Sequence, residues 1–111
     1  MITLIAHIRV KRENAPQFEA LMTEVCDQVR RHESGVPYYG FGRSVDDDET
    51  FVVVEVYRDV VAHSAHMSMP WVRESLPKAA SLMEGRPAVV QYVTAGSAPV
   101  QLSHFARPNP A

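Results

Sequence analysis

The chain lacks the features that mark several specialised classes of protein. It has a single cysteine, Cys26, so it cannot form an internal disulfide. Its longest apolar run, residues 51–54, is far shorter than the roughly 20 residues that a membrane-spanning helix needs. The N-terminal segment has neither the basic start nor the small-residue cleavage site of a secretory signal. We therefore expect a cytoplasmic protein that has no membrane partner.

Basic clusters and cofactor motifs are also missing. The 11 Lys and Arg residues are scattered among 13 Asp and Glu residues, and the formal net charge is −2. Nucleic-acid binding depends on clustered basic side chains, so we expect no nucleic-acid partner. The sequence has no glycine-rich phosphate loop, no dinucleotide fingerprint and no CxxC pair. If the protein is an enzyme, we expect it to work without a nucleotide, flavin or metal cofactor of its own.

The 111 residues, 46% of them hydrophobic, are enough for one ordinary globular domain. A chain of this length buries only about two thirds of its unfolded surface, so partner subunits often enlarge its core.

The first part of the chain predicts a strand over residues 2–10, whose side chains alternate between an entirely apolar set and a mixed set. Asn14, followed by a proline and a glutamine, predicts a capped helix start, and Gly35 predicts its end. The aromatic-rich residues 36–45 and the apolar residues 51–57 flank an acidic turn, which indicates a hairpin.

The C-terminal part predicts a helical region and a last strand. Asp59 is placed to cap a helix, and Pro70 either ends that helix or starts a new one that runs to about Met83. Residues 88–94 form the last strand of a domain that covers residues 1–96, and residues 97–111 form a proline-containing arm, expected on the surface of a dimer. The order β-α-β-β-α-β predicts an α+β ferredoxin-like fold, an antiparallel four-stranded sheet with the helices on one face. Because nothing covers the other face, we expect a homodimer formed through this open sheet face.

Two glycines and several soft or aromatic residues are candidates for a ligand pocket. Gly40 and Gly42 lie two apart in a strand and remove side chains from the same sheet face. They either open a ligand-sized space between the sheet and the helices, or mark a bulge or close helix packing. The candidate pocket walls, which are residue types more often found in plain core, are Tyr38, Met22, Met67, Met69 and Trp71.

The histidines are the main candidates for chemistry. His63 and His66 lie three residues apart on the predicted helix, so they share one face, where an imidazole can act as a base or a hydrogen-bond donor. Spacing alone favours a structural role for His66. Two histidines without a third ligand are a weak metal signal, and we predict no metal site. Four polar residues are expected on the open sheet face rather than in a pocket: Arg9, Arg43, Glu55 and Tyr57.

Several of these segments together resemble a known family. Residues 51–59, with the sequence FVVVEVYRD, are followed by Ala65-His66, by Pro70 and by the pattern Leu82-Met83-x-Gly85-x-Pro87. In order and spacing they resemble the antibiotic biosynthesis monooxygenase family over about residues 1–96. The resemblance implies a dimeric α+β barrel with a pocket between the sheet and the helices of each protomer. The resemblance also carries His66 over as the catalytic residue. With the candidates described above, we expect a substrate pocket formed by Gly40, Gly42, Tyr38, His63, Trp71, Met22 and Met69.

The resemblance implies more than one function. The first is a cofactor-independent monooxygenase that oxidises a small hydroxy-aromatic or quinol-like substrate with O2, with His66 as the base or orienting group. An alternative is an isomerase of a small phosphorylated metabolite, which needs a phosphate-binding cation such as Arg43 or Arg73. Another alternative is a non-catalytic ligand-binding dimer. The haem-degrading branch has an Asn and a His where this chain has Ala6 and Leu76, so that activity is not expected.

Overall fold

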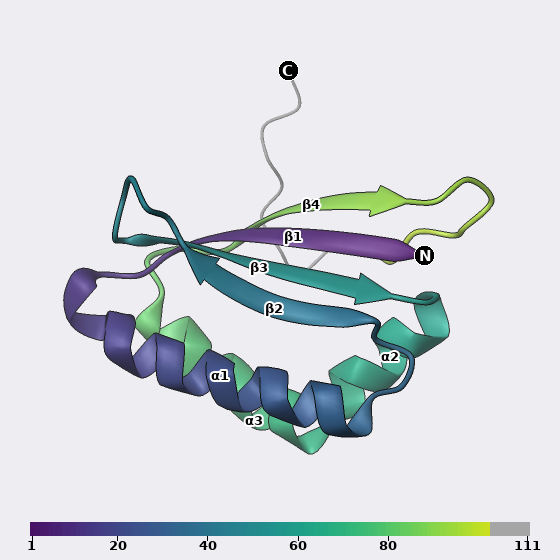
Figure 1. The fold of residues 1–111 in the computed structure, drawn as a ribbon, viewed down its shortest axis with the longest axis horizontal. Coiled ribbons are helices and arrows are strands. Elements are labelled where there is room, and N and C mark those ends of the chain that lie inside the picture. The colour runs from purple at the N-terminus through teal and green to yellow at the C-terminus, as the bar shows by residue number, and fades with distance from the viewer. Residues whose placement is uncertain (103–111) are drawn as a thin grey trace.

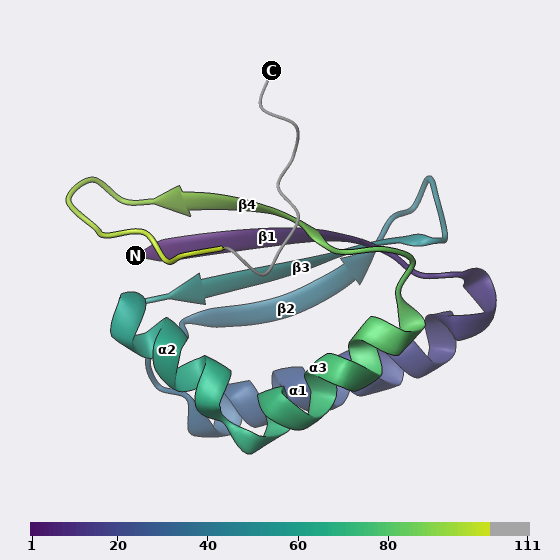
Figure 2. The same ribbon diagram turned by 180° about the vertical axis from the view of Figure 1, so that it is seen from behind.

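A four-stranded antiparallel sheet carries all the helices on one of its faces (Figure 1). The computed structural model describes residues 1–102. Its strands are β1 (Ile2–Arg9), β2 (Tyr38–Arg43), β3 (Thr50–Tyr57) and β4 (Ala88–Val93), in the spatial order β2-β3-β1-β4. Its helices are η1 (Arg12–Asn14), α1 (Ala15–His32), α2 (Val60–Ser68) and α3 (Pro70–Leu82). The predicted α+β ferredoxin-like class is confirmed, and Figure 2 shows the same layers from behind.

The helix boundaries follow local chemistry. The Asp59 side chain accepts a hydrogen bond from the Ala62 backbone N–H at 2.9 Å, which confirms the predicted cap of α2. Pro70 is the first residue of α3, where its missing N–H is not needed, so the helical region is two helices. The predicted Asn14 cap is wrong, because Asn14 ends η1 and makes no capping hydrogen bond. Within residues 1–102, no helix combines the length and apolar character that crossing a membrane requires.

The register of β1 and β3 decides which side chains face the helices. Ile2, Leu4, Ala6 and Ile8 are all at most 7% exposed and stand opposite Tyr57, Glu55, Val53 and Phe51. Directly opposite residues share one sheet face, so Glu55 and Tyr57 point toward the helices. Their predicted place on the open face is therefore wrong. Arg43, opposite Phe51, also lies on the helix side, and of the four residues assigned to the open face only Arg9 lies there.

The glycines of β2 lie on the open face of the sheet, which we define as the face away from the helices. Gly40 and Gly42 stand opposite Val54 and Val52, while Tyr39 and Phe41 turn toward the helices. A Cβ atom on Gly40 would collide with the ring of Tyr38, which lies across it. Gly40 therefore leaves space on the open face for the Tyr38 ring, and neither glycine opens a space beneath the helices.

The first part of the expected C-terminal arm belongs to the core of its own protomer. Val100 and Leu102 are 8% and 4% exposed and join the same apolar cluster as Ile2 and Leu4. The Gln91 side chain holds the Val100 backbone through two hydrogen bonds, of 3.1 Å to its carbonyl and 2.8 Å from its N–H. Residues 103–111 of the expected arm lie outside the described residues.

Candidate active site

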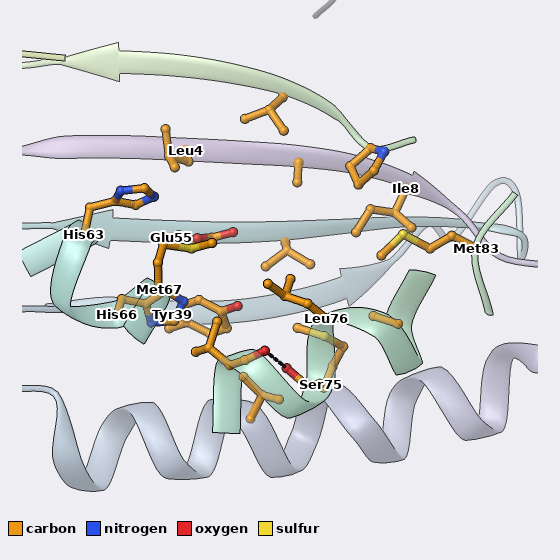
Figure 3. A pocket seen from close by; sticks show the side chains of 18 residues that line it. Leu4, Ile8, Tyr39, Glu55, His63, His66, Met67, Ser75, Leu76 and Met83 are labelled. Carbon is orange, nitrogen blue, oxygen red and sulfur yellow. Dashed lines mark hydrogen bonds between the residues drawn. The ribbon is translucent and has the colours of Figure 1, made fainter. Parts of the chain in front are cut away.

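A cavity of about 100 Å³ lies between the helix side of the sheet and helices α1 to α3 (Figure 3). Most of its wall is apolar, with Leu4, Ala6 and Val53 from the sheet and Met22, Met67 and Val72 from the helices. The polar residues in the wall are Tyr39, Glu55, His63, His66 and Ser75. A mostly apolar cavity with a few polar side chains is the usual form of a binding site for a small molecule.

Leu76 forms the rim of this cavity. It lines the cavity and is nonetheless 44% exposed, so its side chain lies where the cavity meets solvent. A volume of about 100 Å³ corresponds to about three water molecules, and a benzene ring occupies an engineered cavity of about 150 Å³. An aromatic ligand is therefore larger than this cavity, and Leu76 is a side chain that it could displace on entry.

His66 is fixed in the cavity wall by a buried carboxylate. Its Nδ1 nitrogen lies 2.8 Å from Oε1 of Glu33, and both side chains are only 3% exposed. The other carboxylate oxygen of Glu33 accepts a hydrogen bond of 2.7 Å from the indole N–H of Trp71. Because both oxygens of Glu33 have partners, the carboxylate cannot turn away from the imidazole without losing a hydrogen bond.

The second ring nitrogen of His66 borders the cavity. Nε2 makes no hydrogen bond within the described residues. In those residues, every side-chain nitrogen or oxygen that is fully shielded from solvent does have a hydrogen-bond partner. Nε2 is therefore accessible, and the space that His66 lines is the cavity. A carboxylate at Nδ1 favours the tautomer that carries its proton there and leaves the Nε2 lone pair free. This is the arrangement of an oriented general base.

Two aromatic rings pack against the imidazole of His66. The ring centroids of Tyr39 and Tyr57 lie 5.1 and 5.3 Å from that of His66, and Tyr57 also meets His63 edge to face at 4.9 Å. Burial lowers the pKa of His66 below its ordinary value, although the Glu33 carboxylate opposes that shift. Burial and the nearby His66 also lower the pKa of His63. Both imidazoles are therefore neutral at neutral pH, as a base must be.

A close contact between two chain segments sets the position of the His66–Glu33 pair. Glu33 follows the last residue of α1, and Gly35 two residues later packs against Ala62, one helical turn before His66. A Cβ atom on Gly35 would lie 2.8 Å from the Cβ of Ala62, so no larger residue fits without movement. The Gly35 carbonyl also accepts a hydrogen bond of 2.9 Å from the Arg58 N–H, just before α2.

The structure brings some of the sequence-predicted site residues together. His66, His63 and Met22 line the cavity. Trp71 lies outside it and binds Glu33 instead, and Met69 lies outside it at the start of α3. Tyr38, Gly40 and Gly42 lie on the open face. Within residues 1–102, no three His, Cys, Asp or Glu side chains are arranged to hold a metal ion.

Sequence reasoning misses Glu33 as a site residue. A carboxylate at the C-terminal end of a helix opposes the negative end of the helix dipole, and this conflict is the one local signal that marks it. The sequence pattern places Glu55 on the wrong face, and it gives Tyr39, between Tyr38 and Gly40, no role in the pocket.

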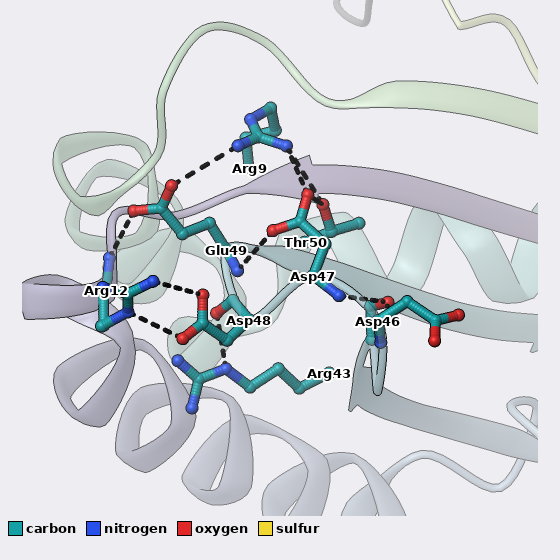
Figure 4. Close-up of polar contacts among 9 residues, drawn as sticks. Arg9, Arg12, Arg43, Asp46, Asp47, Asp48, Glu49 and Thr50 are labelled. Carbon is teal, nitrogen blue, oxygen red and sulfur yellow. Dashed lines mark hydrogen bonds and ion pairs between the residues drawn. The ribbon is translucent and has the colours of Figure 1, made fainter.

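The arginine suggested for phosphate binding is engaged elsewhere. Arg43 donates a hydrogen bond of 2.6 Å to the Asp48 carbonyl (Figure 4). It also pairs with Glu19 at 3.3 Å. Two more arginines bind acidic side chains of the β2–β3 loop. Arg12 of η1 pairs with Asp48 at 2.7 Å, and Arg9 of β1 contacts Asp47 and Glu49. These arginines fix the β2–β3 loop, and neither Arg43 nor the exposed Arg73 lines the cavity.

Comparison with known proteins identifies the family. The sequence profile of the antibiotic biosynthesis monooxygenase family matches residues 1–76, which include β1 to α2 and the His66–Glu33 pair. The chain belongs to the antibiotic biosynthesis monooxygenase family. None of the curated proteins matches this chain significantly.

Solved structures share the fold of this family member at low sequence identity. A protein from Nitrosomonas europaea, provisionally named an antibiotic biosynthesis monooxygenase, is 23% identical with a TM-score of 0.79, covering 86% of this chain and 99% of its own. A protein from Caulobacter crescentus with the same provisional name is 22% identical with a TM-score of 0.78, covering 82% and 86%. The Rv0793 protein of Mycobacterium tuberculosis is 22% identical with a TM-score of 0.76, covering 87% and 97%.

Proposed function

We propose that this protein is a cofactor-independent monooxygenase that oxidises a small hydroxy-aromatic or quinol-like compound with O2. The observation that carries the proposal is the accessible Nε2 of His66 in an apolar cavity, with its Nδ1 held 2.8 Å from Glu33. Membership of the monooxygenase family supports the same reaction class.

In the proposed reaction, His66 removes a proton from a substrate hydroxyl through Nε2. Glu33 stabilises the resulting imidazolium, and the substrate becomes an electron-rich anion. The anion passes one electron to O2, and the two radicals combine to form a C–O bond. Cleavage of the O–O bond of this peroxide gives a quinone. One oxygen atom enters the product, the other leaves as water with two protons, and the substrate supplies all four electrons.

The apolar wall supports this chemistry in two ways. It excludes water, which would otherwise protonate the substrate anion and the peroxide. It also favours a flat apolar substrate over a strongly hydrated one. The phosphorylated-metabolite alternative lacks comparable support, because no arginine or lysine is found among the residues that line the cavity in the described chain.

Oxygen uptake with a series of simple quinols tests the proposal. His66→Ala is expected to lower kcat by about 100-fold or more, the usual contribution of a general base. Ser64→Ala changes an exposed side chain of the same helix outside the cavity and is the control, expected to retain activity. Equal turnover by His66→Ala and the wild type would refute the role of His66. Binding of quinols without oxygen uptake would instead favour a non-catalytic ligand-binding protein.

We further propose that a second copy of the chain covers the open sheet face. Five partly buried apolar residues lie on the open face: Ile5, Val52, Val54, Val56 and Val90. Within residues 1–102, every helix lies on the other side of the sheet (Figure 2). An apolar sheet face of this kind is normally packed against another layer. In a dimer with a two-fold axis, the same face of two identical chains can pack together, and this arrangement fits the homodimer expected from the sequence.

A further inference from the structure

A second ionisable group, Glu55, enters the same cavity from the sheet. It stands opposite Leu4 of β1 and Tyr39 of β2, and all three side chains line the cavity. Figure 3 shows Glu55 extending from β3 while His66 approaches from α2. A carboxylate among apolar side chains is unfavourable unless something compensates for its lost hydration. The pairing of His66 with Glu33 makes no use of this group.

Only one oxygen of Glu55 is occupied. Oε1 accepts a hydrogen bond from the Tyr57 hydroxyl. Oε2 has no hydrogen-bond partner in the described residues, although every fully enclosed side-chain oxygen there has one. Oε2 therefore borders accessible space, and the space that Glu55 lines is the cavity. The cavity thus presents two free proton acceptors, Nε2 of His66 and Oε2 of Glu55.

The surroundings of Glu55 suit proton exchange at neutral pH. Burial raises its pKa to about 7, the Tyr57 hydrogen bond opposes that rise, and Glu33 adds to it. No lysine or arginine is found among the titratable groups around it in the described chain, so Glu55 is not half of an ion pair. These groups are Tyr57 on β3, Tyr39 on β2, Cys26 and Glu33 on or after α1, and His63 and His66 on α2.

We infer that Glu55 is a second catalytic proton acceptor, which takes a proton from a substrate hydroxyl other than the one that His66 deprotonates. This inference rests on the proposed function and narrows the substrate to an aromatic compound with two ionisable hydroxyl groups. Loss of both protons gives a dianion, which transfers an electron to O2 more readily than a monoanion does. Glu55 and His66 then return the two protons to the departing oxygen atom, which leaves as water. With hydroquinone, one O2 is consumed and the products are hydroxyquinone and water.

Hydroquinone and its monomethyl ether differ by one ionisable hydroxyl and therefore isolate the role of Glu55. Glu55→Gln keeps an acceptor for the Tyr57 hydroxyl but cannot take a proton. We expect it to lower kcat/KM for hydroquinone by about 100-fold and that for the ether by less than about 3-fold. The inflection near pH 7 in the hydroquinone profile should disappear. Equal losses on both compounds, or an unchanged inflection, would overturn the inference.

Tyr57→Phe distinguishes a Glu55 that accepts a proton from a Glu55 that only anchors the Tyr57 hydroxyl. It removes the hydrogen bond that lowers the pKa of Glu55, so the inflection in the hydroquinone profile should move to higher pH, whereas in Glu55→Gln it disappears. If Glu55 only anchors Tyr57, Glu55→Gln should instead turn over both compounds as the wild type does, because its amide oxygen still accepts the Tyr57 hydrogen bond, and Tyr57→Phe should leave the inflection where it is.

A binding experiment without O2 keeps the inference distinct from the oxygenase proposal. Difference infrared spectra recorded as hydroquinone binds anaerobically should show the carbonyl band of a protonated carboxylic acid in the wild type but not in Glu55→Gln. Binding without this band, or no binding, would overturn the role of Glu55. The band without any aerobic oxygen uptake would retain Glu55 as a proton acceptor and refute the oxygenase.

Discussion

Nδ1 of His66 and Oε1 of Glu33 lie 2.8 Å apart in a part of the fold that solvent hardly reaches. The two residues come from α2 and from the end of α1, so their contact exists only in the folded chain. It directs one ring nitrogen at the carboxylate and leaves the other at the cavity. The pair and its surroundings can each be tested by substitution.

Glu33→Gln should weaken the base without removing it. The amide has no charge to stabilise the imidazolium, so we expect kcat to fall by about 10- to 100-fold. The pKa of His66, followed by NMR, should fall further, because the carboxylate raises it in the wild type. Glu19→Gln, which removes an exposed carboxylate from the same helix, is the control. An unchanged His66 pKa in Glu33→Gln would show that the contact does not act on the imidazole.

The inflection that His66 contributes to the pH profile should lie below the ordinary histidine range. His66 must be neutral to act, and its folded-state pKa is lower than the ordinary value of 6.5. In the kcat/KM profile of hydroquinone monomethyl ether, which does not need Glu55, the acidic inflection is therefore expected below pH 6.5. The lowered pKa of His66 also makes the free energy of unfolding depend on pH. The contribution of His66 to stability is fully present above pH 6.5 and is lost progressively as the pH falls, because the imidazole takes up a proton more readily in the unfolded chain than in the folded one. Urea unfolding at several pH values measures this loss, and His66→Gln should reduce it.

Leu76 should control which substrates enter. Leu76→Ala removes the rim side chain and is expected to lower KM for two-ring quinols more than for one-ring quinols. Leu76→Trp should raise KM for both, with kcat less affected, because the reacting groups are untouched. Val61→Ala shortens another exposed apolar side chain outside the cavity and serves as the control. If neither Leu76 variant changes KM, entry takes another route.

Val54→Asp should disrupt the proposed dimer. Val54 lies on β3 between Ile5 and Gly40, in the middle of the open face. Burying an unpaired carboxylate there costs at least about 3 kcal/mol, which raises the dimer dissociation constant by about 100-fold or more. Light scattering after gel filtration measures this change. Val45→Asp makes the same substitution at a 98% exposed position in the β2–β3 loop and should leave the mass unchanged.

The layout of the fold is predictable from the sequence because its signals are local and strong. The alternation of residues 2–10, the acidic turn between β2 and β3, and the capping side chain of Asp59 each act over a few residues. Pro70 leaves two possibilities open, since a proline is compatible with both the end and the start of a helix.

The site is harder to predict because it depends on strand faces and long-range contacts. In β2 both alternating sets contain aromatic residues, Tyr38 on one and Tyr39 on the other, so hydrophobicity alone does not tell which set faces the helices. The register with β3 decides it. Glu33 and His66 are 33 residues apart, and no local pattern connects them.

The close packing of Gly35 on Ala62 gives the His66–Glu33 pair a signature that can be read in other sequences. A glutamate two residues before the glycine and a histidine four residues after the alanine form the pattern E-x-G followed by A-x-x-x-H. Chains of this fold that keep both parts should keep the oriented base. Chains in which a bulky residue replaces the glycine should have the glutamate displaced from the histidine, even where both acidic and imidazole side chains remain. The pattern therefore offers a way to divide the family, from amino-acid sequences alone, into members with and without this base.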